Sequence, residues 1–128
     1  MRNEARENAF KLIFEGLFHE CDVELSKDNL VELKKEDDIE FFNAIMTAFE
    51  ENQQTMQQEI ENNLKNYSYS RVFKVDLALI YLALTEIKYC QTPKAVAINE
   101  VLEIAKKYST EKSSKFINGL ISAIINEK

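Results

Sequence analysis

Glycine and proline are almost absent from this chain: only two glycines and one proline occur among its 128 residues. Sheet proteins need these residues, together with pairs such as Asn-Gly, to turn the chain between neighbouring strands. The chain also has no long run of alternating polar and apolar residues, although 45% of its residues are hydrophobic. Length and composition therefore predict one all-α domain around a single core.

Apolar residues recur at helical spacing along most of the sequence. The predicted helical segments are 3–19, a short piece around Leu30–Leu33, 37–65, 75–89, Pro93 to Tyr108, and Phe116 to Ile124. A break of the long segment near Asn52–Gln54 is left open. The segment 75–89 is apolar almost all round, and a helix of that kind must be surrounded by others. We therefore expect it at the centre of the fold.

Side chains that can cap helices suggest where several of these segments begin. Asp37 with Glu40 has the spacing of a capping box, and Ser70 can cap the helix over 75–89. Pro93 suits the first position of the next helix. Residues 109–114 are polar and predict a loop before the last helix.

Three residues of the last two predicted helices suggest specific contacts. Gly119 lies inside a helix, where glycine costs about 1 kcal/mol relative to alanine. We therefore expect another helix or a partner to approach closely there. Glu103 and Lys107 stand four residues apart, which is the favourable spacing for an ion pair on one helix.

Charge is unevenly distributed along the chain. The net charge is -6, which by itself disfavours a general binder of polyanions. Residues 1–64 hold 6 lysines and arginines against 16 acidic residues, whereas residues 65–128 hold 10 against 6. We conclude that the two halves face different surroundings.

Catalytic and metal-binding patterns are missing from the sequence. His19 is the only histidine, and two glycines cannot form a glycine-rich phosphate loop. Asp37 and Asp38 fit a helix start better than a pair of catalytic carboxylates. We expect no enzymatic activity, no metal and no cofactor.

The cysteines and the longest apolar stretch indicate the compartment. Cys21 and Cys90 suit a reducing environment, and no signal-like segment opens the chain. The apolar stretch Val75–Leu84 is too short to span a bilayer and is interrupted by Asp76. We expect a cytoplasmic protein without a membrane segment, and no role is assigned to either cysteine.

Four stretches of the sequence form a recognisable set: Ala5-Arg6-Glu7-x-Ala9, Val75-Asp76-x-Ala78-x-Ile80 leading to Glu86, Val96-Ala-Ile-Asn-Glu100 continuing to Tyr108, and Lys115-Phe116-x-Asn118-Gly119. Together, in this order and over nearly the whole chain, they resemble the NusB transcription antitermination family. The resemblance implies an all-α, NusB-like fold of two small helical bundles packed roughly perpendicular, with about seven helices. It implies a single RNA-binding domain over 1–128, with an N-terminal subdomain 1–66 and a C-terminal subdomain 67–128.

The function that the resemblance implies is that of a non-enzymatic factor. Members of the family bind boxA-type single-stranded RNA of ribosomal RNA transcripts together with the ribosomal protein NusE. This heterodimer helps to load an antitermination complex on RNA polymerase. Some members also self-associate, so a homodimer is left open.

Six residues match the RNA-binding surfaces of the family. They are Arg2 and Arg6 at the N-terminus and Tyr108, Lys112, Lys115 and Phe116 around the last loop. Rings that stack on bases beside lysines that neutralise phosphates suit single-stranded RNA. Family members often have several consecutive arginines at the N-terminus, whereas Asn3-Glu4 interrupts them here. We therefore expect weak RNA binding by the chain alone; Tyr108 and Phe116 also remain candidates for ordinary core residues.

For the NusE-type partner, the resemblance indicates Phe14, Asp76 and Tyr81. Asp76 has a second interpretation as the N-cap of its helix.

Two alternative functions are kept. The first is a NusB-like protein-interaction module in which RNA binding is weakened or lost. The second is the RNA-binding domain of a ribosomal RNA cytosine methyltransferase, which we do not expect because the sequence contains no cofactor-binding domain.

Overall fold

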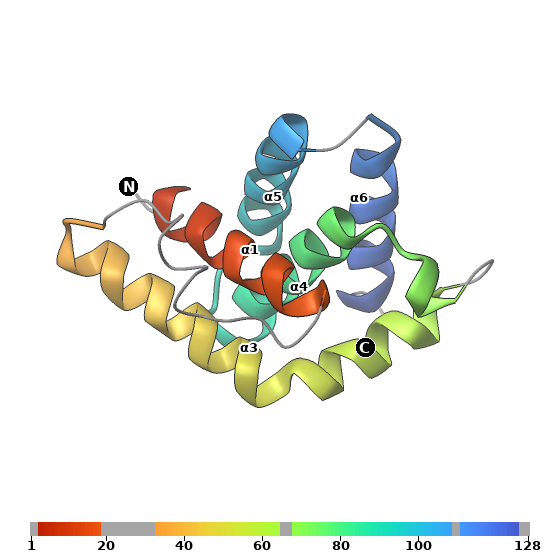
Figure 1. The fold of residues 1–128 in the computed structure, drawn as a ribbon, viewed down its shortest axis with the longest axis horizontal. Coiled ribbons are helices and arrows are strands. Elements are labelled where there is room, and N and C mark those ends of the chain that lie inside the picture. The colour runs from red at the N-terminus through yellow and green to blue at the C-terminus, as the bar shows by residue number, and fades with distance from the viewer. Residues whose placement is uncertain (1–2, 19–32, 65–67, 109–110, 126–128) are drawn as a thin grey trace.

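The computed structural model describes residues 3–18, 33–64, 68–108 and 111–125, and all regular structure in these ranges is helical (Figure 1). The helices are α1 (Asn3–Phe18), α3 (Glu36–Asn63), the 3-10 turn η1 (Tyr69–Arg71), α4 (Lys74–Tyr89), α5 (Lys94–Tyr108) and α6 (Glu111–Ile125). The all-α prediction is confirmed. Against the expected count of about seven, the described ranges contain five α-helices and one 3-10 turn. Leu33 of the predicted short helix is not helical, and Leu30 and Val31 lie outside the described residues.

Helix α4 is the centre of the fold, as its apolar sequence predicts. Every residue from Leu77 to Leu84 is completely buried, and α4 packs against α1, α3, α5 and α6. The buried side chains of these five helices form one continuous cluster. Because each fully buried large apolar side chain stabilises the fold by about 1.5–3 kcal/mol, the position of the other helices is set by how they cover α4.

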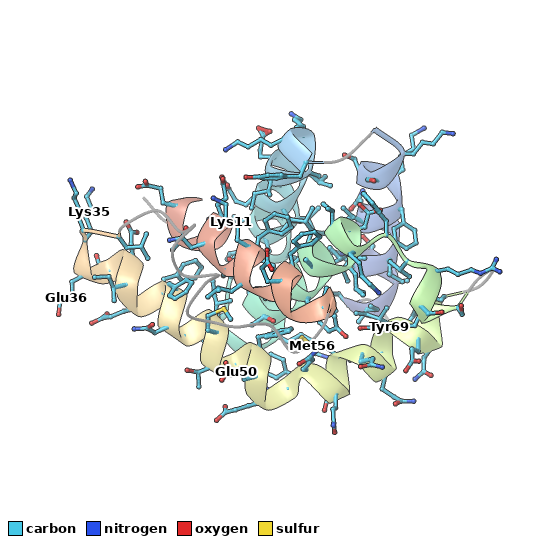
Figure 2. The ribbon with its side chains drawn as sticks, viewed as in Figure 1. Lys11, Lys35, Glu36, Glu50, Met56 and Tyr69 are labelled. Atoms are coloured by element: carbon cyan, nitrogen blue, oxygen red, sulfur yellow. The ribbon has the colours of Figure 1, made fainter. Side chains whose placement is uncertain are left out.

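Helix α3 runs without interruption from Glu36 to Asn63, so the break considered near Asn52 does not occur. The helix instead bends about midway along its length (Figure 1). The Asn52 side-chain amide donates a hydrogen bond to the carbonyl of Ala48 at 2.9 Å, and side chains that bond into the helical ladder in this way bend helices. Phe49 before the bend and Met56 after it are both buried in the core; Met56 is labelled in Figure 2.

Several predicted helix starts are wrong. The N-cap of α3 is Lys35, and no side chain caps the helix, so the capping box of Asp37 and Glu40 does not form. The N-cap of α4 is Phe73, with Ser70 inside η1 and Asp76 inside the first turn of the helix, so neither of them is the cap. In α3 three acidic residues of the first turn lie near the positive end of the helix dipole. They stabilise the start of the helix in place of a capping side chain.

The boundaries of α5 and α6 also differ from the prediction. Pro93 precedes α5, and its carbonyl accepts the first helical hydrogen bond from Ala97 at 3.0 Å. Helix α6 begins at Glu111, so most of the predicted loop 109–114 is helical. Lys112 therefore lies in the first turn of a helix, where its position is fixed by regular backbone rather than by a loop.

Gly119 lies on the exposed face of α6, so the expected close approach of another helix does not occur among the described residues, and the approach of a partner stays a prediction. A Cβ atom built on Gly119 would meet nothing within 4 Å in the described part of the chain. Helix packing within the domain therefore does not require glycine at this position.

We predict that Gly119→Ala stabilises the protein by about 0.5–1 kcal/mol, because alanine loses less backbone entropy in a helix and fits without a clash. Urea denaturation followed by circular dichroism measures this change. Ala123→Gly, on the same helix, should shift the midpoint in the opposite direction. An unchanged or lowered midpoint for Gly119→Ala would show that a neighbour of Gly119 has been overlooked.

Candidate RNA and partner surfaces

A buried ion pair joins α1 to α4. The Nε of Arg6 donates to both carboxylate oxygens of Glu86, at 2.8 and 2.9 Å. Arg6 is 5% exposed and Glu86 is completely buried. The guanidinium also lies over the ring of Phe41, 5.1 Å from its centre. Arg6 was predicted to contact RNA from the surface, but its side chain is inside the domain and bound to Glu86.

Glu86 also organises the turn from α4 to α5. Its backbone carbonyl accepts hydrogen bonds from the amides of Cys90 and Thr92, and its carboxylate accepts one from the Thr92 hydroxyl at 3.1 Å. Between them Gln91 adopts a left-handed backbone conformation with φ of 60°. Burial raises the pKa of Glu86 above its ordinary value, and the charge and hydrogen bonds of Arg6 oppose this rise. Arg6 thus compensates for a carboxylate that would otherwise be costly to bury.

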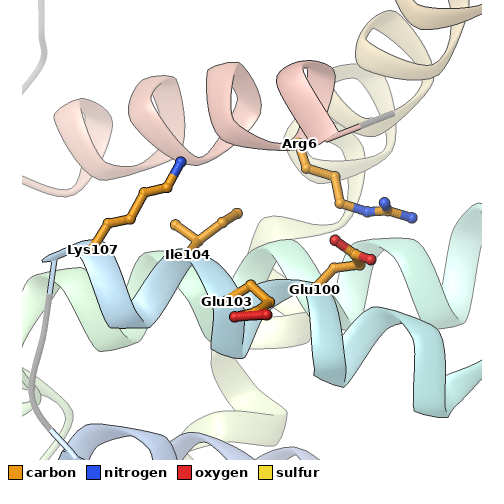
Figure 3. Close-up of a pocket in the computed structure, with 5 residues that line it drawn as sticks. All are labelled: Arg6, Glu100, Glu103, Ile104 and Lys107. Carbon is orange, nitrogen blue, oxygen red and sulfur yellow. The ribbon is translucent and has the colours of Figure 1, made fainter. Parts of the chain in front are cut away.

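A pocket of about 360 Å³ opens between α1 and α5 beside this ion pair. Arg6 enters it from α1, and the residues from α5 that line it are Glu100, Glu103, Ile104 and Lys107 (Figure 3). Lys107 extends from α5 towards α1 at the far end of the pocket from Arg6 (Figure 3). The side of the pocket near Lys107 lies beside the C-terminal end of α5.

The end of α5 is attached to α1 through Glu7. Lys107 donates to one carboxylate oxygen of Glu7 at 2.9 Å, and the Tyr108 hydroxyl donates to the other at 3.0 Å. The Tyr108 ring lies on the ring of Phe10, with the centres 5.2 Å apart. The hydrogen bond from Lys107 is the main cause that lowers the pKa of Glu7 below its ordinary value. The helix spacing had predicted that Lys107 pairs with Glu103, and this prediction is wrong. Glu103 is paired with Lys106 instead, at 3.0 Å.

Four of the predicted RNA-contacting residues lie around the junction of α5 and α6, at one end of the molecule (Figure 1). We call Tyr108, Lys112, Lys115 and Phe116 the α5–α6 end. Tyr108 is 41% exposed, and both lysines are exposed. Phe116 is half-buried and packs against the core, so it is in part the core residue that the alternative interpretation expected. On α6, Lys115 and Phe116 follow Lys112 by three and four residues, so each of them is a neighbour of Lys112 on the helix surface.

Arg2 and His19 lie outside the described residues, as does Cys21. Cys90 is half-buried and is the C-cap residue of α4. In the ranges that the structure describes, no group of three or more histidine, cysteine or acidic side chains is arranged to hold a metal ion. No described helix is both long and apolar enough to cross a membrane.

The three predicted partner contacts differ in accessibility. Phe14 is half-buried and stacks on Phe10, with ring centres 6.0 Å apart. Asp76 is 6% exposed, in the first turn of α4. Tyr81 is completely buried, with its hydroxyl 2.6 Å from that of Tyr69 and its ring edge-on to Phe49. The prediction for Tyr81 is wrong, because a residue in the middle of the completely buried stretch Leu77–Leu84 has no surface for a partner.

Sequence reasoning did not find the contacts that Glu7, Glu86 and Lys107 make with other helices. A signal for Glu86 was present, since a carboxylate in the middle of an otherwise apolar helix must find a partner. No local signal existed for Glu7 and Lys107, because they are 100 residues apart and meet only through packing.

The fold and these surfaces define a small all-helical domain around one buried helix, with exposed cations and an aromatic ring gathered at one end. The chain belongs to the NusB family, whose family model matches residues 3–126. The transcription antitermination protein NusB of Finegoldia magna is 38% identical over 99% of this chain and 95% of its own length. T. maritima NusB has a solved structure with 30% identity and a TM-score of 0.88, covering 99% of this chain and 92% of that one.

A solved structure of antitermination factors NusB and NusE in complex with dsRNA has the same fold. Its TM-score is 0.87 at 23% identity, over 99% of this chain and 97% of that one. The expected fold family is therefore confirmed by sequence and by structure.

We predict that breaking the buried ion pair strongly destabilises the domain. Glu86→Gln and Arg6→Ala should each lower the free energy of unfolding by about 3–5 kcal/mol, because each leaves a buried charge without its partner. The double variant Arg6→Met/Glu86→Leu should recover most of this loss, since apolar residues remove both charges. Urea denaturation measures all three; Lys106→Gln, which breaks an exposed pair, should cost less than about 1 kcal/mol.

We predict that the contribution of Glu7 to stability depends on pH. Because its pKa is lowered from 4.5 in the folded protein, the pair with Lys107 stabilises the fold above about pH 4.5. This contribution is lost as the pH falls through the folded-state pKa. The stability difference between the wild type and Glu7→Gln should therefore be present at about pH 7 and shrink towards about pH 3. A difference that stays constant over this range would contradict the ion pair.

Proposed function

We propose that this protein is a transcription antitermination factor that binds boxA-type single-stranded RNA of ribosomal RNA transcripts together with the ribosomal protein NusE. In this role it promotes antitermination by RNA polymerase. Membership of the NusB family supports the proposal, as does the NusB–NusE–RNA complex that shares its fold. The protein acts without catalysis, in the cytoplasm, as a heterodimer with NusE.

The observation that carries the proposal is the α5–α6 end. The half-exposed Tyr108 ring offers a face for base stacking, and Lys112 and Lys115 on the adjoining helix offer charges for the phosphates. The backbone of these residues lies in regular helices before RNA arrives, so binding does not have to order a loop. Phe116 adds the exposed part of its ring to the same face.

The buried Arg6 has a different role in this proposal. It holds α1 on α4 through Glu86 and thereby positions the N-terminus, where Arg2 remains the proposed phosphate contact. Phe14 remains a proposed contact of NusE, whereas Asp76 is 6% exposed, nearly as buried as Arg6, and offers little surface to a partner. The division into subdomains 1–66 and 67–128 likewise remains a proposal.

One observation favours a second candidate function, a protein-interaction module in which RNA binding is weakened. The N-terminus offers only Arg2 and Arg6 as cations, and Arg6 is already neutralised by Glu86. The chain therefore depends on the α5–α6 end and on a basic partner for contacts with phosphate.

Titration of a fluorescent boxA-type RNA, with and without NusE and at two salt concentrations, tests the proposal. We expect weak binding by the chain alone and tighter binding with NusE. Lys112→Ala/Lys115→Ala should weaken binding and make the salt slope less steep by about 1.4, because each phosphate contact on a single strand contributes about 0.7. Tyr108→Ala should cost about 1–3 kcal/mol through lost stacking.

Lys34→Ala/Lys35→Ala, which removes two exposed lysines just before α3, is the matched control and should leave the slope unchanged. Complex formation with NusE, measured by gel filtration, should be the same for every variant. A chain that binds NusE but no RNA would favour the interaction module, and a chain that binds neither would contradict both functions. Gel filtration of the free chain also reports whether it forms a homodimer.

A further inference from the structure

Glu7 lies where α1 meets the α5–α6 end, and it is bound to two side chains from the last turn of α5. One carboxylate oxygen accepts the hydrogen bond from Lys107 and the other accepts the one from Tyr108. We propose that Glu7 sets the RNA affinity of this surface: it competes with RNA phosphate for Lys107 while it holds the Tyr108 ring in place for stacking. This inference rests on the proposed function.

The pair of Glu7 and Lys107 is accessible to a ligand. The Glu7 side chain is 20% exposed and that of Lys107 is 62% exposed. Lys107 directly precedes Tyr108, the ring proposed to stack on a base, and its side chain crosses from α5 to α1 at the rim of the pocket (Figure 3). A phosphate next to a base on Tyr108 therefore comes within reach of Lys107.

Phosphate and carboxylate oxygens compete for the same ammonium group. A phosphate that binds Lys107 has to replace its hydrogen bond to Glu7, and the freed carboxylate then repels the phosphate. The only other cation that the structure places at Glu7 among the described residues is Lys11, at the longer distance of 3.9 Å. Glu7 thus lowers the affinity for RNA by removing one cation from the surface.

The second oxygen of Glu7 has the opposite effect on the aromatic contact. Tyr108 is fixed at two points, by its hydroxyl on Glu7 and by its ring on Phe10. A ring fixed in this way loses little freedom when a base stacks on it. Charge and positioning can be separated, since glutamine in place of Glu7 still accepts a hydrogen bond from Tyr108 but carries no charge.

Glu7→Gln is the test, made in the full chain with NusE present and with a fluorescent boxA-type RNA as the probe. We expect RNA affinity to rise about fivefold at 0.1 M salt and the salt slope to steepen by about 0.7, the contribution of one phosphate contact on a single strand. Glu4→Gln is the matched control, because it makes the same charge change at an exposed position of the same helix. It should change the affinity much less and leave the slope as it is.

The double variant Glu7→Gln/Lys107→Gln identifies the cation responsible. Its affinity and slope should return to the wild-type values, because the lysine released by the first substitution is then missing. Tyr108→Phe removes the hydroxyl contact but keeps both charges, so its salt slope should equal that of the wild type. Circular dichroism of each variant confirms that the helices are intact.

The inference is overturned if Glu7→Gln binds RNA no more tightly than Glu4→Gln. It is also overturned if Glu7→Gln/Lys107→Gln keeps the higher RNA affinity of Glu7→Gln. In either case the wild type still binds RNA and the proposed function stands. Failure of the wild type and all variants to bind RNA in the presence of NusE would instead remove the proposed function, and the inference with it.

Discussion

The ion pair between Arg6 and Glu86 is the interaction on which the arrangement of the helices depends. Glu86 is a carboxylate in a completely buried stretch of the central helix α4. Such a group is tolerated only when it receives charge and hydrogen bonds in return, and Arg6 supplies both from α1. The apolar faces bring α1 and α4 together, and the contact of Arg6 with both carboxylate oxygens adds a polar requirement that the register of the two helices has to satisfy. Thr92 extends the same network into the turn before α5.

The register set in the core determines the chemistry at the surface. Once Arg6 is directed into the domain, Glu7 and Phe10, which lie about one helical turn apart, are presented to α5. There they meet Lys107 and Tyr108. Helix α1 therefore connects the core to the proposed RNA surface. The buried Arg6 contributes to that surface by positioning α1.

The sequence predicts the main helices well because each depends on a local apolar period, and the family follows from motifs spread along the chain. Helix boundaries are predicted less well. The capping box at Asp37 does not form and Ser70 is not a cap: the N-cap residues of α3 and α4 are Lys35 and Phe73, and neither makes a side-chain cap hydrogen bond. The assignments of Arg6 and Tyr81 to the surface also fail: a residue type indicates what a side chain can bind, whereas its helix face decides whether it is accessible.

The sequence by itself determined the all-α class, the central buried helix and membership of the NusB family. These follow from composition, from periodicity and from residues close together in the chain. The tertiary structure alone decided the partners of the charged residues, such as Lys107 with Glu7 in place of Glu103. An ion pair between residues 100 positions apart has no local signature. It arises only when packing of the apolar faces brings two helices together and fixes their register.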